Sequence, residues 1–192
     1  SFYQYPYKDE SFRVRAHYLR EQAYNRKSLC NVIYQYMEPF GISEKSMENL
    51  KKLEKGALAV VGGQQAGLLT GPLYSVNKAI SVILLSKEQS EKLGIDVVPI
   101  FWIAGEDHDI LEINHTYTIV DGLPKKKIFD VAPRKKTIAS ETRFDHSLMK
   151  DYIDEIFKDY GETEYTHDLY HSVLRHMNDS EDRKSTRLNS SH

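Results

Sequence analysis

The chain has 192 residues, which suits one ordinary domain. Its 26 basic and 28 acidic residues give a net charge of -2, so the charge does not favour nucleic acid or an anionic membrane as a partner. The single cysteine, Cys30, excludes an intramolecular disulfide framework and a cysteine-based zinc finger. No run approaches the ~20 apolar residues of a membrane span and no signal segment opens the chain, so we expect a cytoplasmic protein.

The two ends of the chain do not read as natural termini. The sequence starts at Ser1, inside a pattern rich in tyrosine and phenylalanine, and residues 183–192 (RKSTRLNSSH) hold one aliphatic residue and no period. We interpret this tail as non-native read-through of a sequencing adapter, with an ordinary disordered terminus as the alternative. In either case we set the tail aside and expect the chain to be a fragment.

The N-terminal part of the chain predicts two helices. Apolar side chains recur at spacings of three, four or seven across 11–40, which predicts one long helix that Gly41 stops. The strongly charged segment 44–55 predicts a second, shorter helix, followed by Gly56. Cys30 falls on the apolar face of the first helix, so we expect an inert core side chain there.

The middle of the chain predicts a strand, a helix and a second strand. The apolar run 57–61 predicts a strand buried on both faces, and a glycine-rich loop, 62–71, follows it. Pro72 suits the first position of a helix. The expected buried stripe of that helix is Leu73, Val76, Ile80, Ile83 and Leu84. The run 97–103 predicts a second strand, with Pro99 placed at a sheet edge or a bulge.

This order of elements predicts the fold class. Strand, glycine loop, helix, strand and acidic loop form one right-handed βαβ unit of an α/β protein with a parallel sheet. The two loops then lie at the carboxyl ends of neighbouring strands, where open α/β sheets bind ligands.

The remainder predicts a third strand and two helices. Residues 115–120 read as a strand and 126–129 as a short further one, within an otherwise irregular, charged stretch from 121 to 146. Helices follow at 147–160 and 164–178. Their expected inward side chains are Leu148, Tyr152, Ile156 and Phe157 in the first, and Leu169, Val173 and Met177 in the second.

The glycine loop predicts an anion site. Four glycines in ten residues allow positive φ and close backbone approach, and the loop leads into a helix N-terminus whose free N–H groups favour an anion. Gln64 and Gln65 add neutral donors and acceptors. The loop matches neither the dinucleotide fingerprint nor the P-loop, so a merely permissive turn is the alternative.

The start of the following helix carries three polar candidates. Tyr74, Ser75 and Lys78 are spaced so that they could share a face toward the anion site. Lys78 would clamp a phosphate or carboxylate, and the alternative is a solvated lysine on the outer face.

The acidic loop predicts acid–base chemistry. Glu106, Asp107 and Asp109 surround His108 directly after an apolar strand, and we expect the crowded carboxylates to raise one another's pKa. This arrangement suits general acid–base catalysis or the binding of a substrate ammonium group. Magnesium bound by the carboxylates is an alternative, and so is a solvated, acid-rich helix start. A zinc site is disfavoured, because His108 and the distant His115 are the only suitable nitrogen ligands and no cysteine is near. Trp102, at the end of the second strand, is expected in the core.

Two long strings in the chain resemble a known family. VVGGQQAGLLTGPLYSVNKAIS, followed by VVPIFWIAGEDHDILEINHTY, resembles the bacillithiol-biosynthesis cysteine ligase family of the BshC type. The segment Ser11-Phe12-Arg13-x-Arg15 also resembles the N-terminal part of that family. The match runs from Phe2 to Tyr117, with looser similarity to Asp182.

The resemblance implies a fold and an activity. The family is expected to add L-cysteine to glucosaminyl-malate through an amide bond, the last step of bacillithiol biosynthesis. It implies a Rossmann-like core related to nucleotidyltransferases and a C-terminal coiled coil that dimerises the full-length protein. Residues 1–120 would then be the N-terminal part of the core, 121–182 the start of a connecting, helical segment, and 183–192 the non-native tail. A fragment of this length is expected to be inactive alone.

The resemblance also implies roles for the two loops. ATP is the expected cofactor, with Mg²⁺ as an option, although the HxGH-type histidine pair of nucleotidyltransferases is absent. The expected catalytic residues are Glu106, Asp107, His108 and Asp109. The expected substrate- or nucleotide-binding residues are Gly63, Gln64, Gln65, Gly67, Thr70, Gly71, Tyr74, Ser75 and Lys78. The alternatives are an inactive metabolite-binding or scaffold protein and a nucleotidyltransferase-like enzyme for another substrate.

Overall fold

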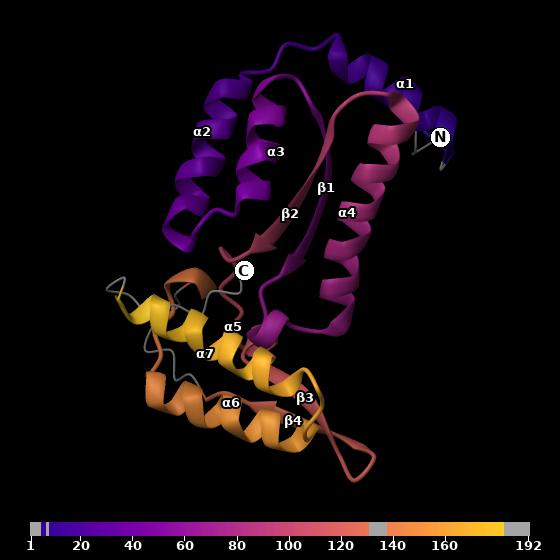
Figure 1. Ribbon diagram of the computed structural model, residues 1–192. Coiled ribbons are helices and arrows are strands. Elements are labelled where there is room, and N and C mark those ends of the chain that lie inside the picture. The colour runs from indigo at the N-terminus through magenta and orange to yellow at the C-terminus, as the bar shows by residue number, and fades with distance from the viewer. Residues whose placement is uncertain (1–4, 7, 131–137, 183–192) are drawn as a thin grey trace. The chain divides into compact units, whose positions relative to one another are not determined.

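The structure is a computed structural model that describes residues 5–6, 8–130 and 138–182. The proposed non-native tail, 183–192, and part of the expected irregular stretch lie outside the described residues. The chain folds as two compact units (Figure 1). The first unit comprises the described residues up to Gly63 together with Asn77–Trp102, and the second comprises Gln64–Val76 together with the described residues from Ile103 on.

The first unit opens with two helices where the sequence predicted one. Helix α1 spans Asp9–Arg20, α2 spans Arg26–Met37, and a 3-10 turn, η1, follows at Glu38–Phe40. The single-helix prediction is wrong because Asn25 begins a new helix, its side chain accepting the N–H of Ser28 at 3.2 Å. Apolar spacing continues across the break, so periodicity alone could not reveal it.

Helix α3, Glu44–Glu54, confirms the second predicted helix, and Ser43 caps it by accepting the N–H of Ser46. A buried cluster lies beneath α2 and α3. Its members are Cys30, Leu53, Ala57 and Val98, with Ile33 and Ile100 packed against them. Cys30 is 6% exposed, and burial raises the pKa of its thiol, so the prediction of an unreactive core cysteine is confirmed.

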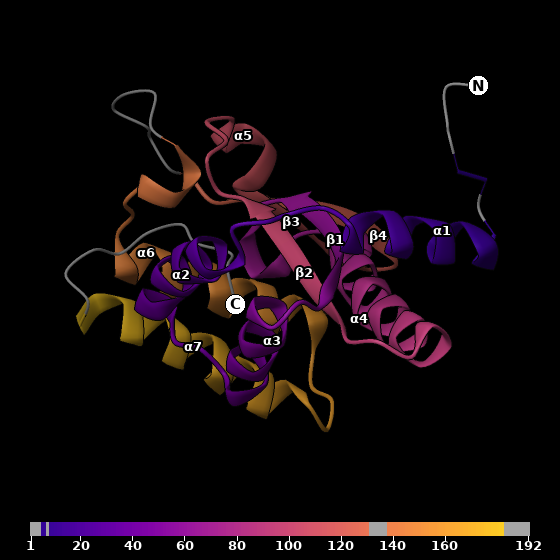
Figure 2. The ribbon, with the colours of Figure 1, turned by 90° about the horizontal axis from the view of Figure 1, so that it is seen from above.

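Strands β1, Leu58–Gln65, and β2, Val97–Ala104, form a two-stranded parallel sheet. Figures 1 and 2 show this sheet between α2 and α3 on one side and α4, Leu73–Leu93, on the other. Each strand has one neighbour in the sheet, which leaves room for Pro99 at an unpaired edge, as expected.

The boundary between strand and loop differs from the prediction. Gly62 and Gly63 lie within β1, because they allow a close approach that any side chain would block. A Cβ on Gly62 would lie 2.5 Å from Cγ2 of Val82 on α4, and one on Gly63 would lie 3.1 Å from the carbonyl oxygen of Trp102 on β2.

The predicted buried stripe of α4 is largely wrong. Four of its five members are exposed: Leu73 (74%), Ile80 (47%), Ile83 (54%) and Leu84 (60%). Val82, Ser86 and Gln89 are buried instead. Ser86 Oγ donates to the Ile83 carbonyl at 2.8 Å, which satisfies a hydroxyl that packs closely on this face.

The second unit contains an antiparallel hairpin. Strand β3, His115–Val120, confirms the third predicted strand, and β4, Leu123–Ile128, pairs with it. Strand β4 begins earlier than the short strand predicted at 126–129. Asp121 and Gly122 connect the strands with φ of 52° and 78°, and positive φ at both central residues is what a two-residue hairpin turn requires.

Helices α6, His146–Tyr160, and α7, Thr166–Asp182, pack over this hairpin and over the short helix α5, Ile110–Ile113. The predicted helices are confirmed, but Leu148 and Leu169 are both 57% exposed rather than inward. The buried face of α6 is one residue out of phase with Leu148. It consists of Met149, Tyr152, Ile153 and Ile156, at spacings of three and four. Val173 and Met177 of α7 pack against this core as expected.

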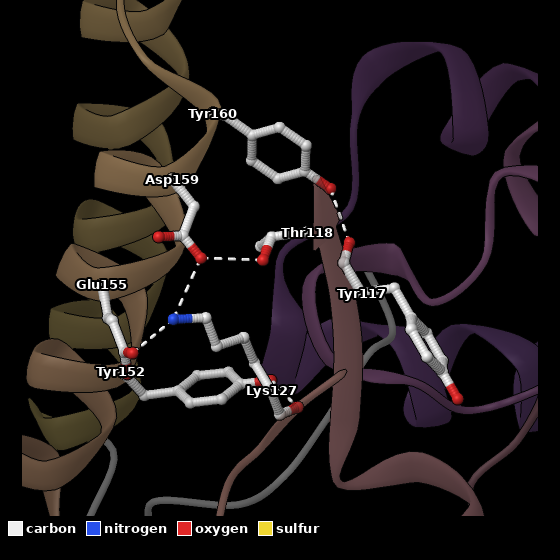
Figure 3. Close-up of polar contacts among 7 residues, drawn as sticks. All are labelled: Tyr117, Thr118, Lys127, Tyr152, Glu155, Asp159 and Tyr160. Atoms are coloured by element: carbon white, nitrogen blue, oxygen red, sulfur yellow. Dashed lines mark hydrogen bonds and ion pairs between the residues drawn. The ribbon is translucent and has the colours of Figure 1, made fainter. Parts of the chain in front are cut away.

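A polar network that the sequence did not reveal ties α6 to the hairpin (Figure 3). Lys127 is 6% exposed, and its Nζ donates to Glu155 and, at 2.9 Å, to Oδ2 of Asp159. The same Asp159 oxygen accepts the Thr118 hydroxyl at 2.7 Å. Hydrogen bonding to Glu155 and Asp159 raises the pKa of the Lys127 ammonium. The Tyr152 hydroxyl donates to the Lys127 carbonyl, and burial raises its pKa to about 12.

Within the described part of the chain, no helix combines the length and apolar content that crossing a membrane requires.

Candidate active site

The last residues of β1 and β2 belong to the second unit, and so do the loops that follow them. In the first of these loops, Leu68–Thr70 form a 3-10 turn, η2. Leu69, Thr70 and Gly71 have φ of 51°, 74° and 69° in succession. The left-handed region costs an ordinary residue roughly 1–2 kcal/mol, so the surrounding structure must enforce it at the two non-glycine positions. Such strain is concentrated at ligand-binding and catalytic loops in proteins.

Glycine at two positions lets this loop close on itself. A Cβ on Gly67 would lie 2.8 Å from the Cα of Gly71, nearer than real Cβ contacts allow. A Cβ on Gly71 would lie 3.6 Å from Oγ of Ser75. The loop is therefore compact and directs its backbone to the N-terminus of α4.

Ser75 gives the clearest sign of a ligand at this helix start. Its side chain is 8% exposed, and its Oγ has no hydrogen-bond partner among the described residues. Buried hydroxyls in proteins are almost always hydrogen-bonded, so an isolated one at a helix N-terminus indicates a group that arrives from outside. The first N–H groups of α4 and the positive end of its dipole favour a negatively charged group there.

A hydrogen bond joins the two predicted loops. Gln65, the last residue of β1, donates through Nε2 to Oδ2 of Asp107. Gln64, one residue earlier, donates to the Tyr74 hydroxyl at 3.5 Å. The structure therefore brings the glycine loop, the start of α4 and the acidic loop together, as the position at the carboxyl ends of neighbouring strands predicted.

The acidic loop is held by backbone contacts from much later in the chain. The Ser140 N–H donates to the Gly105 carbonyl at 2.9 Å, and the Ala139 N–H donates to the Asp107 carbonyl at 2.7 Å. Ala139 is fully buried. This support could not be predicted from the sequence, because backbone donors about thirty residues away carry no side-chain signature.

Asp107 is the least exposed acid of the loop, with 27% of its side chain exposed. Its Oδ1 accepts the backbone N–H of Asp109 at 3.0 Å. Hydrogen bonds from the backbone of Asp109, then from the backbone of His108 and the Gln65 amide, hold the pKa of the Asp107 carboxyl below its ordinary value. The expectation that crowding raises the pKa is wrong for Asp107, because these donors outweigh the cost of desolvating the carboxylate.

His108 lies next to Asp107 in the acidic loop. Its Nδ1 lies 3.9 Å from Oδ1 of Asp107, and its side chain is 65% exposed. Glu106 and Asp109 are exposed on either side. An imidazole beside an ionised carboxylate can accept a proton from a substrate and be stabilised as the cation.

Gly63 and Lys78 lie in the first unit, where Lys78 Nζ donates to the Gly63 carbonyl at 3.3 Å. Their assignment to the binding site stays a prediction. Trp102, also in the first unit, is 56% exposed rather than in the core, and its ring stacks on Tyr36 at 6.5 Å between centroids.

No metal-binding cluster of three or more histidine, cysteine or acidic side chains occurs among the residues that the structure describes. The acidic loop offers one well-ordered carboxylate, Asp107. A single carboxylate suits a metal ion that is bound mainly by water and phosphate oxygens better than one bound by protein groups alone.

The fold defines an α/β protein of the Rossmann-like class, with the two loops at the carboxyl ends of its parallel strands. The model of the family "Bacillithiol biosynthesis BshC, N-terminal Rossmann-like domain" matches residues 1–187. The chain belongs to this family, which confirms both the predicted resemblance and the predicted fold class.

Individual relatives agree with the family match. The chain is 51% identical over 180 residues to a protein of Lysinibacillus sphaericus (strain C3-41) named "Putative cysteine ligase BshC", covering 94% of this chain and 34% of that protein. Proteins of the same name from Geobacillus thermodenitrificans (strain NG80-2) and Bacillus cereus (strain B4264) are 43% and 41% identical, over 90% and 97% of this chain. These alignments cover 32% and 34% of the two proteins. The chain thus spans about a third of the length of the curated relatives it matches.

Proposed function

We propose that the protein containing this chain is a cysteine ligase that joins L-cysteine to glucosaminyl-malate, the last step of bacillithiol biosynthesis. The names of the relatives and of the family support this reaction class. The observation that carries the proposal is the hydrogen bond between Gln65 and Asp107, which joins an anion-binding loop to an ionised carboxylate. An enzyme that forms amides needs both, because it must bind a carboxylate or phosphate group and must also deprotonate an amine.

The glycine loop supplies the anion half of the site. Gly67 and Gly71 let the backbone approach a ligand closely, and the buried Ser75 hydroxyl can donate to its oxygen. The occupant is a substrate carboxylate or a nucleotide phosphate, because the α4 N-terminus favours either. ATP, when bound, supplies the free energy that amide formation requires.

The acidic loop supplies the amine half. An ammonium group must lose a proton before its nitrogen can attack the carboxyl carbon of cysteine. The Asp107 carboxylate accepts the N–H of that group and orients it, while His108 takes the proton as general base. Glu106 and Asp109 add negative charge that attracts the cation. The C–N bond then forms as a C–O bond of the cysteine carboxyl group breaks, and the departing oxygen would leave on the phosphate that ATP supplies.

Further parts of the proposal follow from this chemistry. Mg²⁺ would enter with nucleotide phosphates and take Asp107 as a protein ligand, since Mg²⁺ binds through one or two carboxylates together with substrate phosphates. The cytoplasm is the proposed location, because ATP and free cysteine are available there. The homodimer expected for the family belongs to the full-length protein.

The test is turnover by the full-length protein. We expect ATP consumption and an amide product, detected by mass spectrometry, only when cysteine and glucosaminyl-malate are both present. His108→Ala and Asp107→Asn should each reduce kcat by about 10²–10⁴. Glu112→Gln, which alters an exposed carboxylate three residues beyond Asp109, is the matched control and should leave kcat unchanged.

The same assay separates the alternatives. Product absent under all conditions with intact, folded protein would overturn the ligase proposal. Calorimetric binding of glucosaminyl-malate without turnover, lost in Asp107→Asn, would instead establish a metabolite-binding protein.

The glycine loop has its own test. Gly67→Ala places a Cβ against Gly71, so we expect ATP binding measured by calorimetry to weaken at least tenfold. Gly122→Ala is the control: it strains the backbone at φ 78° in the hairpin turn, outside the glycine loop, with open space around the added methyl. Equal loss of binding in both variants would assign the effect to general destabilisation.

A further inference from the structure

Two histidines of α7 face each other across one helical turn. His167 and His171 are four residues apart, so their side chains lie on the same face of the helix. The two Nε2 atoms are 3.1 Å apart, and the ring centroids are 4.3 Å apart. Both residues are exposed, with 80% of the His167 side chain accessible.

The separation of the two nitrogens matches a chelate. A transition metal binds imidazole nitrogen at about 2.0–2.1 Å, so two neighbouring ligands at angles of 90–110° stand roughly 2.9–3.4 Å apart. The observed 3.1 Å falls inside that interval. Paired histidines at this spacing on a helix are the arrangement through which many zinc enzymes hold their metal.

The other ring nitrogen of His167 is also placed as in metal sites. Its Nδ1 lies 3.5 Å from Oδ1 of Asp168. Metal-binding histidines commonly present their second nitrogen to a carboxylate, which fixes the tautomer and leaves the Nε2 lone pair for the metal. The nearby helix N-terminus opposes a cation with about half a unit charge, and the full charge of the Asp168 carboxylate offsets it.

In the metal-free protein the short distance is explained by a hydrogen bond. One imidazole donates N–H to the other, so one proton occupies the space between the two nitrogens. When the donating ring moves its proton from Nε2 to Nδ1, a metal ion can engage both Nε2 lone pairs at once, with no movement of the backbone.

We infer that His167 and His171 bind a divalent transition metal ion, with Asp168 as a positioning residue. No third protein ligand converges on this pair among the described residues, so water completes the coordination and the ion is exchangeable. Among Ni²⁺, Cu²⁺ and Zn²⁺, the affinity should be highest for Cu²⁺, as for nitrogen ligands generally. The site is separate from the two loops of the proposed ligase and does not depend on that function.

The test is direct titration of the untagged 192-residue chain with Ni²⁺, Cu²⁺ and Zn²⁺. We expect one bound equivalent by calorimetry and selective broadening of the His167 and His171 imidazole NMR signals by Ni²⁺. His167→Ala and His171→Ala should each weaken binding at least tenfold. Asp168→Asn should retain binding with affinity reduced by about tenfold or more.

His176→Ala is the matched control. His176 lies on the same helix with its Nδ1 near the Ser172 carbonyl, and the variant is expected to leave metal binding unchanged. All variants alter exposed side chains, so circular dichroism should be unchanged. Binding that survives His167→Ala and His171→Ala together, or no binding by the wild-type chain, would overturn the inference.

Discussion

Asp107 shows how the backbone of one loop sets the charge of a carboxyl group. The N–H groups of Asp109 and His108 stabilise the ionised form, and Gln65 adds a third donor. Neighbouring acids would act in the opposite direction, and the sequence revealed only these acids. The residue types and their adjacency could be predicted, whereas the donors depend on the turn that the loop adopts.

The ionised state of Asp107 can be measured directly. Its carboxyl ¹³C signal should titrate with a midpoint below about 3.9, the ordinary value for Asp. A lowered folded-state pKa contributes stability that is present above about pH 3.9 and is lost as the pH falls through the folded value. Gln65→Ala should raise the midpoint, and Gln64→Ala, which removes the amide bonded to Tyr74, should leave it unchanged. A midpoint above 3.9 in the wild type would contradict the prediction.

At the scale of elements, the sequence predicts the order of helices and strands better than it predicts which face of each helix is buried. The alternation of strand, helix and strand was evident from apolar runs and glycines, and helices α6 and α7 followed from periodicity. In α6, Tyr152 and Ile156 were correctly predicted to be buried, and Leu148 was not, because Leu148 and Met149 both fit the helical spacing and only packing selects Met149. The contacts of Ala139 and Ser140 with the acidic loop could not be predicted, since they join distant segments through the backbone.

The phase of α6 has a stability test. Ile156 is 2% exposed, so Ile156→Ala should cost about 2–5 kcal/mol in the free energy of unfolding, measured by urea denaturation. Leu148→Ala removes an aliphatic side chain of similar size from the same helix, but from an exposed position, and should change it by less than about 0.5 kcal/mol. A similar loss in both variants would mean that Leu148 is also buried in solution.

The Lys127 network predicts a particular pH dependence. Lys127→Met should lower the melting temperature, because Asp159 and Glu155 lose the ammonium group that they bind. Lys126→Met, on the exposed side of the same strand, should not. The Lys127 pKa is raised, so its contribution is complete below about pH 10.4 and is lost as the pH rises through the folded value.

Asp159 sets the lower end of the pH range over which this network stabilises the fold. Its pKa is lowered, first by the hydrogen bond from Lys127, so its contribution is present above about pH 3.9 and is lost on acidification. The difference in melting temperature between wild type and Lys127→Met should therefore be constant between about pH 5 and 9. A difference that varies across that interval would contradict the assignment.

At the scale of the whole molecule, the outstanding feature is apolar surface on α4. Ile80, Ile83 and Leu84 share one face of the helix and are 47%, 54% and 60% exposed. Contiguous exposed aliphatic side chains favour association with another surface. Helical spacing identified this stripe correctly and placed it in the core incorrectly, because spacing shows that side chains share a face but does not show what covers that face.

This surface should make the isolated 192-residue chain associate. We expect the apparent mass by sedimentation to rise with concentration, and we expect the chain to bind a hydrophobic dye. Ile83→Lys should reduce both effects, whereas Lys87→Glu, an exposed change one turn later that leaves the apolar face intact, should not. A chain that stays monomeric and binds no dye at high concentration would contradict the exposure seen here.

The contact between Gly62 and Val82 has a genetic consequence. A methyl group at position 62 would stand 2.5 Å from one methyl of Val82, and this single atom is its closest neighbour. Gly62→Ala should therefore be a loss-of-function allele that a second mutation, Val82→Ala, suppresses by vacating the volume that the new methyl occupies. Selection for revertants of Gly62→Ala should recover changes at codon 82. Such suppressors would identify the contact between the strand and the helix by genetics alone.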